Sequence, residues 1–171
     1  MRRFPLFLAL LAVAVAPITA HAAKITKASA TVTDGNIRTT EPPPTLYHGG
    51  LLVEFNEIGV PGKTDVTYLV TADATATYAC VNNGDNHPKA VNKQGVGGPV
   101  SATATFTSGS NGNVTGGIGV PPIGPGSFGC PPGQSAILSD VSYTNVVITD
   151  TTNGASFSIP GTFSLTLVPL K

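Results

Sequence analysis

The alternation of apolar and polar residues predicts an all-β protein that folds as a two-sheet antiparallel sandwich of about eight strands, immunoglobulin-like in the broad sense. Within residues 65–82 the even positions are apolar or small for eight repeats, from Val66 to Cys80, and the odd positions are mostly threonine. Successive side chains of a strand point to opposite faces, so this stretch has a core face and a hydroxyl-rich face. Turn residues recur at short intervals, as in sandwiches, and a closed barrel is the alternative.

The first 22 residues have the pattern of a secretory signal peptide. A charged start precedes the apolar run 4–15, and Ala20-His21-Ala22 supplies small residues at both recognition positions of a cleavage site. A membrane anchor needs about 20 apolar residues, and this run is shorter. We therefore expect residues 23–171 to form a single exported domain, extracellular or periplasmic, without a membrane span.

The charge balance excludes nucleic acid as a partner. From Ala23 onward the chain has seven basic and nine acidic side chains, a net charge of 7 − 9 = −2. Binding to phosphates requires clustered Lys and Arg, whereas Lys63, Lys89 and Lys93 are scattered among glycines and asparagines.

Cys80 and Cys130 are the only cysteines of the chain. An even number of cysteines in an exported protein predicts a disulfide bond. A reactive thiol or a metal pair is the competing interpretation, but the chain has no CxxC spacing to favour it. One disulfide is therefore expected, and it would close a loop of about 50 residues, which stabilises a fold by roughly 4 kcal/mol in the chain-entropy estimate.

The remaining strands follow from the same alternation, read between turn residues. In chain order the expected strands are 25–33, 51–56, 65–82, 100–107, 113–120, 135–150, 157–159 and 163–167. Asn111-Gly112 and Asn153-Gly154 have the composition of hairpin turns. The polar, glycine-rich passage from residue 83 to residue 98 is expected to be a loop.

Two of these strands are too long to be straight. Eighteen residues at about 3.3 Å each would span nearly 60 Å, far beyond the usual strand of three to ten residues. In the central strand we place the bend at Asp73, as a bulge or a change of sheet. In 135–150 the apolar residues change from odd to even positions between Tyr143 and Val146, which predicts a bulge near Asn145.

A resemblance to known proteins adds to this reading. The sequence TADATATYACVN at 71–82, with Asn86-His87-Pro88 and with VSYTNV at 141–146, resembles a group of small exported bacterial β-sandwich proteins without established function. The likeness covers residues 51–167. It implies secretion and a β-fold, and it implies no catalytic activity.

The leading hypothesis for function is a secreted, non-enzymatic domain with an interaction or cell-surface-associated role. Its partner is unknown and is expected to be a protein or a cell-surface polymer. No G-x-S-x-G motif occurs, and Glu54 and Glu57 lie at opposite strand parity, so they face different ways. We therefore expect no catalytic residues, no cofactor and no metal ion.

Two alternatives remain. The first is a carbohydrate- or calcium-binding module that uses the 82–88 loop, where oxygen-bearing side chains gather: Asn82, Asn83, Asp85, Asn86 and His87. The same residue types also form turns, and the chain has no Trp to stack on a sugar. The second is an unrecognised enzyme, for which Glu54, Asp73 and His87 are the titratable groups to test.

Overall fold

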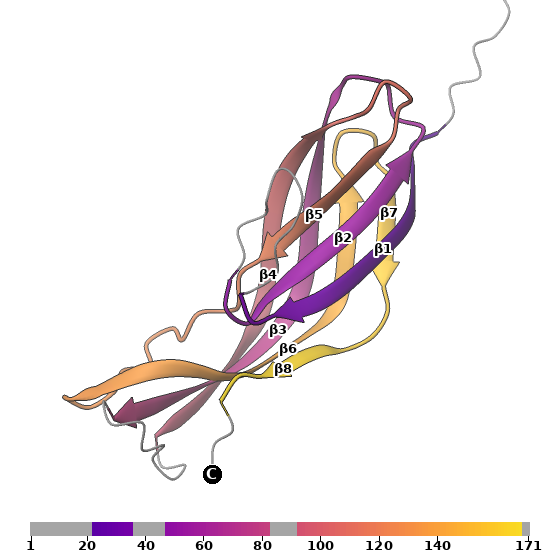
Figure 1. The fold of residues 1–171 in the computed structure, drawn as a ribbon. Coiled ribbons are helices and arrows are strands. Elements are labelled where there is room, and N and C mark those ends of the chain that lie inside the picture. The colour runs from indigo at the N-terminus through magenta and orange to yellow at the C-terminus, as the bar shows by residue number, and fades with distance from the viewer. Residues whose placement is uncertain (1–21, 36–46, 83–91, 169–171) are drawn as a thin grey trace, which may run out of the picture.

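The computed structural model describes residues 22–35, 47–82 and 92–168, and every regular element in these ranges is a β-strand (Figure 1). The eight strands are β1 (Lys24–Thr33), β2 (Gly50–Ile58), β3 (Asp65–Asn82), β4 (Lys93–Thr107), β5 (Val114–Val120), β6 (Gln134–Asp150), β7 (Ser156–Ile159) and β8 (Phe163–Thr166). The described residues contain no helix that is long and apolar enough to cross a membrane. The predicted all-β class is confirmed.

The strands form two antiparallel sheets that pack as a sandwich. One sheet has three strands in the order β1-β2-β5, and the other has five, in the order β4-β3-β6-β7 with β8 also paired to β6. Figure 1 shows the three-stranded sheet lying across one face of the larger sheet, while the ends of β3, β4 and β6 continue past it. The five-stranded sheet is therefore the longer layer.

β3 is a central strand of the larger sheet, and its side chains alternate between the two faces of that sheet. Its bounds, Asp65–Asn82, are those that the alternation predicts. From residue 66 to residue 78 every even position is buried, and the odd positions are exposed or half-buried. β3 is paired with β4 on one side and with β6 on the other. It contributes more buried core residues than any other described strand.

The predicted bend is in the partner strand. β3 pairs with β4 from Asp65 to Ala79 without interruption and stays in one sheet, so the change of sheet expected at Asp73 was wrong, whereas the expected bulge is present as a register shift between Thr71 and Asp73 in the pairing with β6. The extra residue is in β6, where Asn145 has a φ of 53° and disrupts the register opposite Asp73. The side chain of Asn145 donates to Asp73 Oδ2 at 2.8 Å. The bulge predicted near Asn145 is confirmed, and it lets a long strand keep its apolar side chains on the core face.

Two expectations about β4 were wrong. Residues 93–98, expected in a loop, begin this strand, because pairing with β3 satisfies their backbone groups despite their glycines. Asn111-Gly112 forms a turn, with a φ of 74° at Gly112, but β4 and β5 belong to different sheets, so the turn crosses the sandwich and no hairpin forms. Asn153-Gly154 does connect paired strands, β6 and β7, as predicted.

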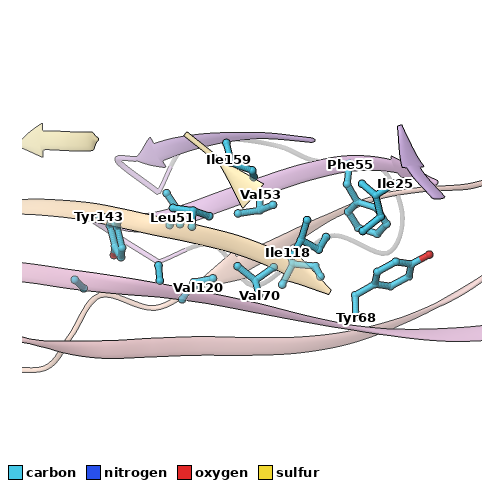
Figure 2. Close-up of a cluster of buried hydrophobic side chains, with 14 of the residues drawn as sticks. Ile25, Leu51, Val53, Phe55, Tyr68, Val70, Ile118, Val120, Tyr143 and Ile159 are labelled. Carbon is cyan, nitrogen blue, oxygen red and sulfur yellow. The ribbon is translucent and has the colours of Figure 1, made fainter. Parts of the chain in front are cut away.

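The core lies between the sheets, where side chains of β2 meet side chains of β3 and β4. Figure 2 shows Leu51, Val53 and Phe55 of β2 directed toward side chains from the larger sheet. The rings of Phe55 and Tyr68 have centroids 4.3 Å apart, and Phe106 of β4 meets both rings edge-on. This aromatic contact joins the two sheets, and burial of such rings is a main source of stability.

The predicted disulfide is present between Cys80, near the end of β3, and Cys130, in the segment before β6. The two Cα atoms are 5.5 Å apart, a normal separation for a disulfide. The bond attaches this segment to the end of the five-stranded sheet that extends past the smaller sheet (Figure 1).

Candidate functional site

The binding loop suggested by the sequence falls almost wholly outside the described residues. Asn82 is the last residue of β3, is exposed and pairs with Gln134 of β6. Asn83, Asp85, Asn86 and His87 lie outside the described ranges. A calcium or carbohydrate site in this loop therefore stays a prediction.

The carboxylates proposed for an enzyme are not brought together. Glu54 is exposed on β2 of the three-stranded sheet, whereas Asp73 is exposed on β3 of the five-stranded sheet. Each side chain points outward from its own layer, so the core separates them. His87, the third residue of that set, lies outside the described residues.

A groove crosses the outer face of the five-stranded sheet, the face turned away from the core. Two rows of paired residues, running from β4 through β3 and β6 to β8, form it. The first row is Gly97, Thr75, Ser142 and Ser164, and the second is Gly95, Thr77, Asp140 and Thr166. All eight residues line one cavity of about 460 Å³.

The sequence explains why the sheet is hollowed here. The glycines of β4 have no side chains to fill the groove, and a Cβ atom built on Gly95 would meet no other atom within 4 Å. On β3, β6 and β8 the short side chains of threonine and serine leave room above the backbone while presenting hydroxyl groups. The result is an open groove edged by hydroxyl groups, with methyl groups from its threonines. Ala76, Val96, Val141 and Leu165 also line it, but they alternate with the outward residues and have the core-facing parity.

Of the described residues that line the groove, only Asp140 has an ionisable side chain. Its Oδ1 accepts a hydrogen bond from Thr166 Oγ1 of β8 at 2.9 Å. Its Oδ2 lies 2.9 Å from the hydroxyl of Ser139, a buried residue of β6 that also lies 3.0 Å from the carbonyl oxygen of Thr77. The carboxylate is thus held in place, and its remaining lone pairs can accept hydrogen bonds from a ligand.

Sequence reasoning identified the hydroxyl face of β3 but missed the groove. The sequence does indicate a polar outer face on β6, because Asp140, Ser142 and Thr144 share the outward parity, as the threonines of β3 do. What the sequence does not state is that β8 returns to pair with β6, which places Ser164 and Thr166 beside that row.

Within the described ranges, no group of three or more His, Cys, Asp or Glu side chains is placed to hold a metal ion. Comparisons of the chain with protein-family models, with curated proteins and with solved structures found no match. The case for function therefore rests on the residues and on their geometry.

Proposed function

We propose that this protein is an exported, non-enzymatic interaction domain that binds its partner through the groove on the outer face of the five-stranded sheet. The observation that carries this proposal is the groove itself, about 460 Å³ in volume and crossed by four strands. A site on paired strands is held more rigidly than one on a loop, which suits recognition.

Export is supported by two features. The signal-peptide pattern of residues 1–22 predicts secretion, and the Cys80–Cys130 disulfide is typical of proteins in an oxidising compartment. The immunoglobulin-like topology and the likeness to small exported bacterial proteins remain expectations from the sequence.

The groove favours a neutral, hydroxyl-bearing polymer such as a cell-surface polysaccharide. Thr75, Thr77, Ser142, Ser164 and Thr166 offer hydroxyl groups that both donate and accept, and Asp140 offers a carboxylate acceptor. These groups match the alternating donors and acceptors of a sugar chain. A protein partner is the other occupant that the experiment below can identify.

The test fills the groove without disturbing the fold. Gly95→Tyr adds a ring beside Thr77, at an exposed position where a Cβ meets nothing within 4 Å. Gly124→Tyr is the matched control, because that glycine is also exposed and also open but does not line the groove. The mature protein and both variants are compared in co-sedimentation with amylose, β-glucan and chitin, and in pull-downs from the exported fraction.

We expect the unmodified protein and Gly124→Tyr to retain the same bound material and Gly95→Tyr to lose it. Retention of a polysaccharide identifies a glycan partner, and retention of a single polypeptide identifies a protein partner. Equal binding by both variants would contradict the placement of the site in the groove. An absence of binding in every sample would contradict the proposed function.

A further inference from the structure

Two carboxyl groups are buried together at one end of the sandwich, away from the groove. Glu57 of β2 and Asp150 at the end of β6 are both 0 % exposed. Tyr68 of β3 connects them, since it is the cross-strand partner of Asp150 and donates its hydroxyl to Glu57 Oε2 at 2.5 Å. Figure 2 shows this hydroxyl directed away from the aliphatic side chains of Val70 and Ile118. The three polar residues therefore join the two sheets.

The two carboxyl groups of this cluster accept different numbers of hydrogen bonds. Asp150 already accepts three, from the backbone N–H groups of Thr152 and Asn153 at 2.7 and 2.9 Å, and from Asn153 Nδ2 at 2.7 Å. Glu57 accepts one at Oε2, whereas its Oε1 is buried without any donor. A buried polar atom without a partner is costly, so this oxygen requires an explanation.

A proton supplies the missing partner. Two ionised carboxylates can only accept hydrogen bonds, so a bond between Glu57 and Asp150 requires one of them to be protonated. We propose that Glu57 is protonated in the folded protein and donates from Oε1 to Asp150, so that the pair is a proton-binding site whose occupancy stabilises the fold. This inference concerns a different region from the groove and does not depend on the proposed function.

The surroundings of Glu57 support this assignment. Its neighbours in the three-stranded sheet are Ile25 of β1 and Val114 of β5, neither of which titrates. The ionisable groups that act on it from the opposite sheet are Tyr68 and Asp150. Lys24 and Lys27 of β1 are exposed, and the described strands β5 and β7 carry no charged residue.

The charges and hydrogen bonds around Glu57 determine whether stability rises or falls with pH. Burial raises the pKa of Glu57 above its ordinary value of 4.5, the hydrogen bond from Tyr68 lowers it, and the charge and hydrogen bond of Asp150 raise it. The net pKa shift is upward, so the folded protein binds this proton more tightly than the unfolded chain. The stabilisation is complete below pH 4.5 and is lost as the pH rises through the raised pKa. Within that window the folding equilibrium constant falls by up to about tenfold per pH unit.

Loss of the proton would affect the turn between β6 and β7. The same Asp150 carboxylate holds that turn, which is also bound to β3 through Thr67: Thr151 N donates to Thr67 O, and Thr67 N donates to Thr152 Oγ1, both at 2.9 Å. When Glu57 ionises, two negative charges face each other in a buried site. We expect the turn to loosen before the rest of the sandwich.

The test measures denaturant unfolding of the mature protein from pH 4.5 to pH 8.5, beside Glu57→Gln and Glu54→Gln. Glutamine at residue 57 keeps an N–H donor for Asp150 and an oxygen for Tyr68 at every pH. Glu54→Gln is the matched control, because it removes an exposed carboxylate from the same strand. We expect the midpoint of the wild-type protein to fall relative to Glu57→Gln as the pH rises, and Glu54→Gln to follow the wild type. Parallel curves for the wild type and Glu57→Gln would overturn the proposal.

A second measurement needs no variant. Hydrogen exchange of the wild-type protein reports the protection of the Thr152 and Asn153 amides, whose N–H groups bind Asp150. After correction for the intrinsic exchange rate, we expect their protection to fall as the pH rises through the raised pKa of Glu57, while the protection of core β3 amides stays higher. Protection of the two amides that is independent of pH would also overturn the proposal.

Discussion

At the scale of single residues, the sandwich depends on a few polar groups that are buried with their partners. Tyr143 of β6 is 0 % exposed, and its hydroxyl donates to the carbonyl oxygen of Gly49 at 2.7 Å. Burial raises the pKa of this tyrosine, which therefore stays a neutral donor. The bond connects the five-stranded sheet to the residue that precedes β2, so one hydroxyl joins the two layers.

We predict that Tyr143→Phe destabilises the protein by about 1–3 kcal/mol, because it leaves the buried carbonyl of Gly49 without a donor while it keeps the ring. Urea unfolding at constant pH measures the change. Tyr47→Phe serves as the control, since that tyrosine is 36 % exposed and its substitution should leave the midpoint unchanged. A Tyr143→Phe variant as stable as the wild type would show that the hydrogen bond contributes nothing.

The buried carboxyl groups show which features of a core a sequence pattern reveals and which it does not. Glu57 shares the parity of Val53 and Phe55 on the core face of β2, and Asp150 shares that of Ile148 on β6. The sequence thus places each carboxyl on an apolar face. It does not show that the two faces meet, because that contact depends on how the sheets stack.

At the scale of elements, most strand positions were predictable, apart from the start of β4, and strand pairing was not. The limits of β3 follow from an alternation that is bounded by turn residues on both sides. Asn111-Gly112 and Asn153-Gly154 carry the same local signal, yet only the second connects paired strands. A turn motif fixes local backbone geometry, and tertiary packing decides which sheet the next strand joins. The groove depends on such a non-local pairing, between β6 and β8.

The disulfide stabilises the elements at the extended end of the larger sheet. It links β3 to the segment before β6 and closes a loop of 50 residues that contains β4 and β5. We predict that the Cys80→Ala/Cys130→Ala variant loses roughly 4 kcal/mol of stability, through the larger entropy of its unfolded chain. Guanidinium unfolding of the oxidised wild type and the variant tests this. An unchanged midpoint would mean that the bond leaves the unfolded state unaffected.

At the scale of the whole molecule, the sandwich has two layers of unequal length. Their inner faces stabilise the fold, and the outer face of the longer layer provides the proposed binding site. The inner faces of the sheets form the core, and the outer face of the longer sheet carries the hydroxyl groups and the groove. β3 is common to both, because from residue 66 to residue 78 its even residues face the core and its odd residues face outward. Both the stability and the proposed role therefore depend on the separation of these two faces of β3.

Denaturant unfolding of Val70→Asp and Thr71→Asp, adjacent substitutions on β3, tests this separation of faces directly. Val70 is 0 % exposed and Thr71 is exposed. Val70→Asp should bury an unpaired charge and abolish the cooperative transition. Thr71→Asp should change the free energy of unfolding by only about 0.5 kcal/mol. Equal losses from the two substitutions would contradict the proposed division of β3 into a core face and an outer face.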